Sequence, residues 1–245
     1  MKKVIITILF INILMAQDIK VVSAANLKFF FDDIIDAYNL KYPNDNIIIE
    51  FNSSGELTKK IINGKKYDIF LAANMYYPQR LYKLGFANSE AKLYTTGSLI
   101  LLVSKQKGLS KDKLNILLDP TIKEITIANK RTAPYGMAAI EALKNANIYD
   151  KVKDKLFYST DASNIIGDVL WYGHTGILPK SAINFLPRGY NIEGENYIDI
   201  PQEFYKPIKQ GFCISKDGIK RNGVNRFINF ILGEGQDIFK RNGYK

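Results

Sequence analysis

The sequence predicts an α/β protein with two lobes, and two observations support this prediction. Short apolar runs typical of strands alternate with segments whose apolar residues recur at helical spacing, which is the pattern of a parallel sheet with crossover helices. A second set of such elements begins near Ile125, after the first set has ended. No long linker rich in proline or glycine separates the two sets, so strands that cross between the lobes could join them.

The first 16 residues have the features of a secretory signal peptide. Lys2 and Lys3 precede an apolar run, residues 4–15, that is too short to span a membrane. A buried first strand is the alternative interpretation of this run. We expect cleavage near Ala16 and a periplasmic mature chain, with no cysteine placed to carry a lipid anchor.

Three strands, each preceding a helical or loop segment, are expected in the first set. They are residues 19–22, 47–51 and 67–73. After the first strand, apolar residues recur at helical spacing at Leu27, Phe30, Phe31, Ile34 and Tyr38. Pro43 lies beyond the end of this helix.

The second set follows an apolar run at residues 98–104, starts with a strand at 125–128 and ends near Ile200. The tail then returns with a strand at 211–215 and an amphipathic helix through Phe227, Phe230 and Ile231. We therefore expect one lobe of residues 17–98 plus 208–245, and a second lobe of residues 99–207.

Composition excludes several classes of protein. The net charge of +10 comes from lysines spread along the whole chain, which favours a solvated basic surface over a nucleic-acid-binding patch. The single cysteine, Cys213, cannot form an intramolecular disulfide and is expected in the core. The single histidine, His174, is expected to contact a helix C-terminus or solvent rather than to act in catalysis. No zinc, iron–sulfur, Walker or dinucleotide-binding motif occurs, so we expect neither a cofactor nor a bound metal cation.

Four junctions between expected strands and helices are neutral and could bind an anion. In open α/β sheets, ligands bind beyond the carboxyl ends of the strands, where the first turn of the next helix offers unpaired N–H groups and a positive dipole end. The junctions contain Asn26, Ser54, the Pro134-Tyr135-Gly136 turn and Ala162.

Each junction also has a simpler interpretation. Asn26 could only cap the helix that follows it, and Ser53, with Glu56 at the spacing of a capping box, could do the same for the next helix. Asp161 is a candidate N-cap, and a Pro-Tyr-Gly sequence is a turn by default. Four neutral junctions in two sets nevertheless form a pattern that one junction does not.

With these junctions in place, the chain resembles the periplasmic molybdate-binding proteins, the solute receptors of molybdate ABC importers. The resemblance spans essentially the whole mature chain. It rests on the order and spacing of short motifs at residues 23–27, 52–57, 67–73, 134–136, 161–162, 176–177 and 235–244. It implies a type II periplasmic binding protein, whose two α/β lobes are joined by crossing hinge strands and close over the ligand.

The same resemblance implies the residues of the site. Family positions fall on Asn26, with Ala25 beside it, and Ser54 in lobe one, and on Tyr135 and Ala162 in lobe two. Some members place a tyrosine ligand where this chain has Pro179, which has no N–H group. We expect Tyr135 to supply the missing donor, through its hydroxyl or only through its backbone.

The expected ligand is molybdate or tungstate, bound as an oxyanion, and the implied partner is an ABC permease at the inner membrane. These positions include no carboxylate, so the proton of a phosphate would find no acceptor. The family implies a monomer that is not an enzyme. The alternatives are a receptor for another tetrahedral oxyanion such as sulfate, and a periplasmic enzyme on the same fold, such as a dehydratase.

Overall fold

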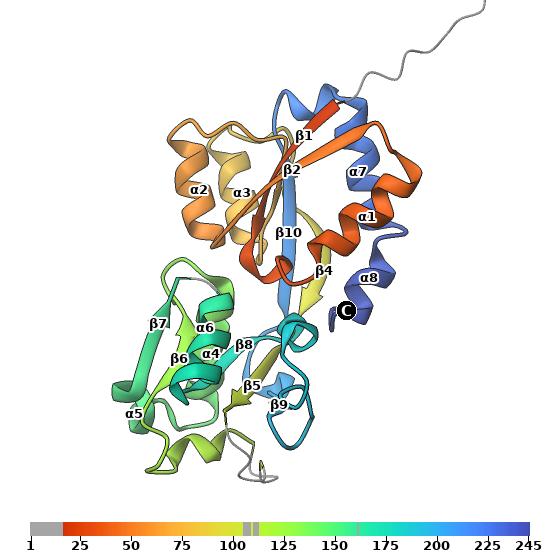
Figure 1. Cartoon of the computed structure of the whole chain (residues 1–245). Coiled ribbons are helices and arrows are strands. Elements are labelled where there is room, and N and C mark those ends of the chain that lie inside the picture. Colours follow the sequence, from red (N-terminus) through yellow and green to blue (C-terminus); the bar gives the residue numbers. More distant parts are fainter. Residues whose placement is uncertain (1–16, 105–108, 110–112, 161) are drawn as a thin grey trace, which may run out of the picture.

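Two five-stranded sheets, one in each lobe, form the core of the protein in a computed structural model (Figure 1). The structure describes residues 17–104, 109, 113–160 and 162–245, so the expected signal peptide lies outside the described residues. The predicted fold, two α/β lobes, is confirmed. None of the helices in these ranges is both long and apolar enough to cross a membrane.

The first sheet has the strand order β2-β1-β3-β10-β4. Strand β1 runs parallel to β2 and β3, whereas β10 is antiparallel to both of its neighbours. The bounds are β1 Gln17–Ala24, β2 Asp45–Asn52, β3 Ile69–Leu71, β4 Lys92–Gly97 and β10 Ile208–Ile214.

The second sheet has the strand order β7-β6-β8-β5-β9. Strand β6 is parallel to β7 and β8, and β5 is antiparallel to β8 and β9. The bounds are β5 Leu99–Val103, β6 Ile125–Ala128, β7 Leu156–Ser159, β8 Thr175–Pro179 and β9 Tyr197–Asp199.

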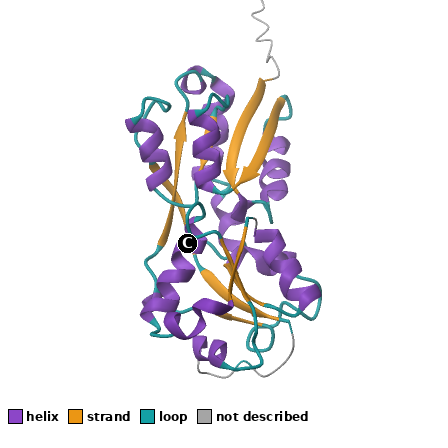
Figure 2. Ribbon diagram, turned by 90° about the vertical axis from the view of Figure 1, so that its left-hand side faces the viewer, coloured by secondary structure: helices purple, strands orange, loops and turns teal. Residues whose placement is uncertain are grey.

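Helices cover both faces of each sheet (Figures 1 and 2). The α-helices are α1 Phe31–Lys41, α2 Ser54–Ile62, α3 Tyr76–Lys83, α4 Pro134–Asn145, α5 Tyr149–Val152, α6 Ala162–Tyr172, α7 Asn222–Leu232 and α8 Gln236–Arg241. The 3₁₀ helices are η1 Ala25–Leu27, η2 Lys113–Leu118, η3 Lys153–Lys155, η4 Lys180–Phe185, η5 Gln202–Phe204 and η6 Gly218–Lys220.

Alternation along the strands divides each lobe into two cores. In β3, Ile69 and Leu71 pack with α1 and α7, whereas Phe70 between them packs on the opposite face with α2 and α3. In β5, Leu99 and Leu101 likewise join the core under α4, and the alternate residues Ile100 and Leu102 join the core under α6. Successive side chains of a strand point to opposite faces, so a fully apolar strand needs helices on both sides.

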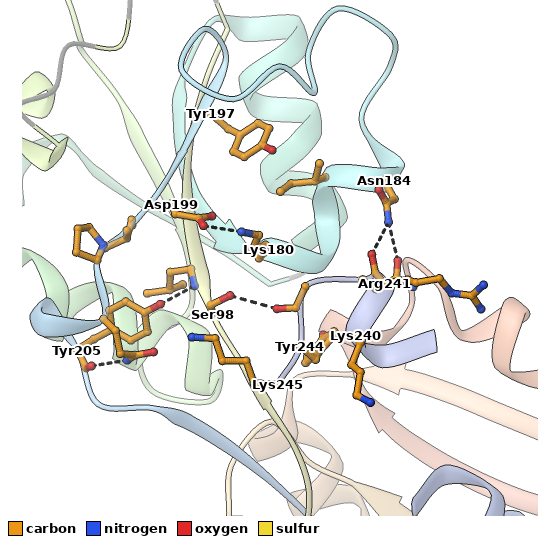
Figure 3. A pocket seen from close by; sticks show the side chains of 17 residues that line it. Ser98, Lys180, Asn184, Tyr197, Asp199, Tyr205, Lys240, Arg241, Tyr244 and Lys245 are labelled. Atoms are coloured by element: carbon orange, nitrogen blue, oxygen red, sulfur yellow. Dashed lines mark hydrogen bonds and ion pairs between the residues drawn. The ribbon is translucent and has the colours of Figure 1, made fainter. Parts of the chain in front are cut away.

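Two crossings connect the lobes. Ser98 lies between β4 of the first sheet and β5 of the second, and residues 200–207 return the chain from β9 to β10. The C-terminus lies at the same place, because Lys245 exchanges two backbone hydrogen bonds of 2.9 Å with Thr96. Figure 3 shows this region, where the Ser98 hydroxyl donates to the Gly243 carbonyl and the Tyr205 hydroxyl accepts from the Leu99 N–H. The lobe boundaries at residues 98/99 and 207/208 stay a prediction.

The first helix differs from the prediction. The helical spacing from Leu27 predicted one continuous helix with Asn26 as its N-cap, but α1 begins only at Phe31. Residues 25–27 instead form η1, whose N-cap is Ala24. The Asn26 carboxamide is held by tertiary hydrogen bonds, described below, and so the capping interpretation is wrong.

Candidate functional site

A small cavity lies where the two lobes meet, at the starts of several helices. It is lined by Ala24, Ala25, Asn26, Ser53, Ser54, Ala73, Ala128, Ala133, Pro134, Tyr135, Thr160 and Pro179. Four of the five predicted site residues, Ala25, Asn26, Ser54 and Tyr135, are therefore brought together. They come from both lobes, as an interlobe site requires.

Asn26 is positioned by the end of β1. The strand stops at Ala24, and the 3₁₀ turn that follows places Asn26, which is buried, against the cavity. Its Nδ2 donates to Gln210 Oε1 at 3.0 Å and to Tyr244 Oη at 2.8 Å. Its Oδ1 is buried and has no hydrogen-bond partner among the described residues. Buried polar atoms are rarely left without a hydrogen-bond partner.

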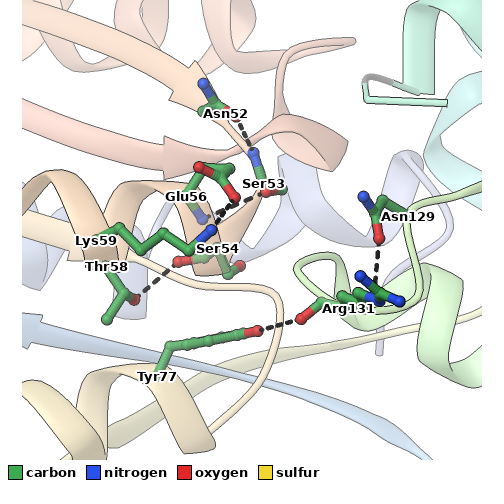
Figure 4. Close-up of polar contacts among 9 residues, drawn as sticks. All are labelled: Asn52, Ser53, Ser54, Glu56, Thr58, Lys59, Tyr77, Asn129 and Arg131. Atoms are coloured by element: carbon green, nitrogen blue, oxygen red, sulfur yellow. Dashed lines mark hydrogen bonds and ion pairs between the residues drawn. The ribbon is translucent and has the colours of Figure 1, made fainter.

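Two neighbouring serines at the start of α2 have different roles. Ser53 is the N-cap, and its hydroxyl accepts from the Glu56 N–H at 3.4 Å, as the capping interpretation predicted (Figure 4). The Ser54 hydroxyl is fully buried and accepts from the Ala73 N–H at 3.0 Å. That bond uses the serine oxygen as an acceptor, so the hydroxyl hydrogen can be donated to a ligand. The Ser54 N–H, at the first position of α2, has no acceptor within its own helix.

Tyr135 lies in the first turn of α4, directly after Pro134 at the first position of the helix. Its backbone N–H is one of those that no intrahelical carbonyl can accept. Its hydroxyl lies 2.9 Å from Gln210 Nε2, which donates to it in the described arrangement. Burial of the hydroxyl, and then the neighbouring Tyr244, raise the pKa of Tyr135 well above its ordinary value, so the hydroxyl stays protonated at neutral pH.

The fourth junction is described in part. Ala162 is the first residue of α6, and Thr160, two residues earlier, is an exposed member of the cavity lining. Asp161, the predicted N-cap between them, lies outside the described residues. Pro179 lines the cavity at the end of β8 and, without an N–H group, donates nothing from its backbone.

The cavity is neutral and small. Its described lining contains no lysine, arginine, aspartate, glutamate or histidine. Its volume is about 30 Å³, room for about two or three water-sized groups. Such a site can hold a compact anion through N–H and O–H donors and the positive ends of helices, without any cationic side chain.

The two lobes touch directly beside the cavity. The Gly55 N–H of α2 donates to the Thr132 carbonyl oxygen. Figure 4 shows a second contact, in which the Tyr77 hydroxyl lies 3.5 Å from the Arg131 carbonyl oxygen. On the other side, the Ser181 hydroxyl of η4 donates to the Asn26 carbonyl oxygen at 2.9 Å. The described arrangement is therefore a closed one.

Other potentially reactive side chains, those of His174 and Cys213, make structural contacts away from the cavity. His174 was expected to contact a helix C-terminus or solvent, and its backbone N–H donates to the Asp168 carbonyl oxygen near the end of α6 at 3.3 Å. Its ring is held within the same lobe, because Nδ1 lies 3.1 Å from Thr126 Oγ1 and Nε2 contacts the Glu124 carboxylate. Cys213 is fully buried, as predicted. In the described ranges, no three histidine, cysteine or acidic side chains gather as they would around a metal ion.

The prediction missed several lining residues, and one signal could have found them. Ala24, Ala73 and Ala128 are small residues at or just beyond strand ends, where the chain must leave room for a ligand. The prediction also missed Gln210, which lies outside the cavity lining but contacts both Asn26 and Tyr135.

A family model described as bacterial extracellular solute-binding protein matches residues 19–245, which is nearly all of the described chain. The chain belongs to this family. The solute-binding protein is 27% identical over 233 residues to the molybdate-binding protein ModA of Azotobacter vinelandii, covering 94% of this chain and 90% of that relative. It is 26% identical over 196 residues to ModA of Rhodobacter capsulatus, covering 79% and 75% of the two chains.

A solved structure agrees with this assignment. The periplasmic molybdate-binding protein of Azotobacter vinelandii superposes on the solute-binding protein with a TM-score of 0.83 at 23% identity, covering 93% of this chain and 98% of that one. The similarity at this identity shows that the two share a fold. The resemblance to periplasmic molybdate-binding proteins that the motifs indicated is confirmed.

Proposed function

We propose that this solute-binding protein binds one molybdate or tungstate ion in the cavity between its lobes, in the periplasm, and delivers it to an ABC permease. The observation that carries the proposal is a neutral cavity of about 30 Å³ surrounded by N–H and O–H donors at the starts of η1, α2 and α4. The two relatives described above are named molybdate-binding proteins, which supports this choice of ligand.

The proposed donors come from both lobes. In lobe one they are the Ser54 hydroxyl and backbone groups of Ala25, Asn26 and Ser54. In lobe two they are the backbone N–H groups of Tyr135 and Ala162. Donors that converge only in the closed arrangement give the ligand a higher affinity for that arrangement, so binding shifts the equilibrium toward closure.

The chemistry of the lining favours an oxyanion that carries no proton. Molybdate, tungstate and sulfate are fully ionised at neutral pH, whereas phosphate keeps at least one proton. A protonated oxygen requires an acceptor, and the described part of the lining, which has no carboxylate, offers few. Selection of molybdate or tungstate over sulfate would then depend on the size of the cavity, since all three are tetrahedral anions with the same charge.

The same lining supports a role in binding rather than in catalysis. General acid–base chemistry needs a side chain that titrates near the working pH within reach of the ligand. Tyr135 is the titratable side chain in the described lining, and burial raises its pKa well above the ordinary value for tyrosine.

Isothermal titration of the anion-free protein with molybdate, tungstate, sulfate and phosphate tests the proposal. We expect one-to-one binding of molybdate or tungstate that is at least about a hundredfold tighter than binding of sulfate or phosphate, a difference of about 2.7 kcal/mol. If the protein binds sulfate most tightly, the proposed ligand is wrong but the proposed binding site is retained. Binding of none of the four anions would overturn the proposal.

A further inference from the structure

A buried carboxamide, that of Gln210, connects the candidate site with the strands that join the lobes. Gln210 lies in β10 and is fully buried. Its Oε1 accepts from Asn26 Nδ2 at 3.0 Å and from the Tyr94 hydroxyl at 2.9 Å. Its Nε2 donates to the Tyr135 hydroxyl at 2.9 Å. One side chain of lobe one thus contacts site residues from both lobes.

The network leaves one conspicuous defect. Both hydrogens of Asn26 Nδ2 are used, toward Gln210 and Tyr244, and the buried Asn26 Oδ1 has no partner among the described residues. Asn26 lines the cavity. An unpaired carbonyl oxygen is costly when buried, and it would repel the negative oxygens of an anion beside it.

A second arrangement of the same side chains removes this defect. The two ends of a carboxamide are nearly equal in size, so hydrogen bonds decide which end points where. If both amides are turned end for end, Gln210 Nε2 donates to Asn26 Oδ1, and the Tyr244 hydroxyl can donate to the same oxygen. Asn26 Nδ2 then takes the place of the unpaired oxygen and can donate to a ligand.

The remaining members of the network tolerate the exchange. The Tyr135 hydroxyl donates to Gln210 Oε1 in place of accepting from Nε2. The Tyr94 hydroxyl accepts from Gln210 Nε2 and keeps the Ala72 carbonyl oxygen, 3.3 Å away, as its own acceptor. The Tyr244 hydroxyl turns its one hydrogen from the Asn26 carbonyl oxygen and Ser181 Oγ, 3.2 Å and 3.1 Å away, to Asn26 Oδ1, while the Ser181 hydroxyl still donates to that carbonyl oxygen. Each hydroxyl can act as donor or acceptor, so every bond that the two carboxamides make in this network survives with its direction reversed.

We infer that Gln210 is a positioning residue that sets the orientation of the Asn26 carboxamide, and that an anion in the cavity selects the arrangement in which Asn26 Nδ2 donates to it. This inference rests on the proposed function. Gln210 also forms a hydrogen bond with Tyr135 of the opposite lobe. When the anion reorients the two carboxamides, it therefore also reverses the direction of this hydrogen bond between the lobes.

Gln210→Glu tests the inference directly. A carboxylate only accepts hydrogen bonds, so Asn26 must keep Nδ2 toward residue 210 and present Oδ1 to the cavity. The Tyr94 and Tyr135 hydroxyls can still donate to the carboxylate, which preserves the packing of the network. We expect Gln210→Glu to weaken binding of sodium molybdate, measured by isothermal titration at pH 8, by at least about thirtyfold.

The added charge could weaken anion binding by itself, and a double-mutant cycle with Asn26→Ala separates the two effects. If Gln210 acts through Asn26, the Gln210→Glu change costs at least about thirtyfold in the wild-type background and less than about threefold in the Asn26→Ala background. Equal losses in both backgrounds would show charge repulsion alone and overturn the inference.

Two further readouts keep the test decisive if Gln210→Glu folds poorly. Gln210→Met removes the orienting carboxamide without adding charge, and we expect it to weaken binding severalfold in the wild-type background only. In the NMR spectrum of protein labelled with ¹⁵N-asparagine, the Asn26 side-chain amide signals can be identified because they are absent from the spectrum of Asn26→Ala. We expect molybdate to shift these signals, and unshifted signals would overturn the inference. If the wild type binds molybdate but the effects are additive, the proposed function stands and the positioning role fails. If the wild type does not bind, both fail.

Discussion

The backbone N–H of Gly55 donates a hydrogen bond to the carbonyl oxygen of Thr132, with 2.9 Å between the two atoms. Gly55 lies in the first turn of α2 and Thr132 precedes α4, so this bond joins the helix starts of opposite lobes. A Cβ on Gly55 would lie 2.9 Å from both Cα and O of Thr132 and 2.8 Å from the Tyr77 hydroxyl. Such distances are too short, so only glycine permits this approach.

Gly55→Ala is therefore expected to hinder closure and to leave the separate lobes intact. We expect anion affinity to fall by about tenfold or more, because the closed arrangement becomes strained, about 1.4 kcal/mol for each factor of ten. The melting temperature of the anion-free protein should change little. Titration calorimetry and thermal unfolding measure the two effects.

Gly167→Ala is the matched control for that substitution. Gly167 is also in a helix, α6, and its added Cβ meets only atoms of the Trp171 ring, at 3.3 Å and 3.4 Å. Trp171 is 80% exposed and can move aside. Equal losses of affinity in the two variants would contradict the role of Gly55 in closure.

Ser54 and Ser53 provide a second matched pair. Ser54→Ala removes the hydroxyl proposed to donate to the anion and also the acceptor of the Ala73 N–H. We expect a loss of about 1–3 kcal/mol in binding free energy, roughly 5-fold to 150-fold in affinity. Ser53→Ala removes only the N-cap, so it should lower the free energy of unfolding by about 1 kcal/mol and leave affinity nearly unchanged.

Titration and urea denaturation of both serine variants distinguish these effects. The expected outcome is that the two variants lose similar stability but differ in affinity. A Ser54→Ala protein that binds as tightly as the wild type would exclude the hydroxyl as a donor.

Tyr135→Phe tests whether the tyrosine acts through its hydroxyl or through its backbone. The hydroxyl is within hydrogen-bond distance of Gln210, which would be left with a buried amide end unpaired. We expect a loss of about 1–3 kcal/mol in the free energy of unfolding and only a severalfold loss of affinity. If affinity instead falls a hundredfold while stability is kept, the hydroxyl is itself a ligand donor, and an unchanged affinity would limit Tyr135 to its N–H group.

Stability should decline at alkaline pH because of buried acids, and Cys213 gives a clean case. Burial raises the pKa of its thiol from an ordinary value of 9.0 to about 12. Between these values the unfolded chain has lost this proton and the folded chain keeps it. The contribution of the thiol is therefore complete below pH 9 and is lost as the pH rises toward 12.

Comparison of the wild type with Cys213→Ala isolates this effect, since the alanine has no proton to lose. We expect the difference in the free energy of unfolding between the two proteins to shift by about 1–3 kcal/mol against the wild type from pH 8 to pH 11, measured by urea denaturation. The pKa of Tyr94 is also raised by burial, and its effect is the same in both proteins and cancels. The Tyr67 hydroxyl lies 3.9 Å from Cys213 Sγ, but its pKa is raised mainly by burial, which is common to both proteins. A constant difference would mean that the thiol titrates normally.

Local pattern was sufficient to predict much of the fold. The strand predicted at residues 125–128 is β6 with the same bounds, and the helix that Ser53 was expected to cap is α2, which ends at Ile62. Gly64 adopts a positive φ of 98°, which explains why glycine stops the helix there. Apolar periodicity and breaker residues are properties of a few consecutive residues, and they can be recognised in the sequence.

Contacts between distant residues could not be predicted in this way. Asn26 has the composition of an N-cap, yet its carboxamide is bound by Gln210 and Tyr244, which follow it by 184 and 218 residues. Only the fold brings these side chains together. A glutamine directly before the apolar run of the predicted strand at 211–215 was the one available signal, since a polar residue in a buried strand needs polar partners.

The position of β10 in the first sheet has a consequence for the newly made chain. Strands β5 to β9 all come from one continuous stretch of sequence, but β10, which separates β3 from β4, leaves the ribosome only after all of them. Until it arrives, β3 and β4 lack the partner between them, and α7 and α8 are not yet present to cover α1. The first sheet therefore stays incomplete, and open to binding by chaperones, until the second lobe and β10 have been synthesised. A chain interrupted before residue 208 would be expected to complete only its second lobe.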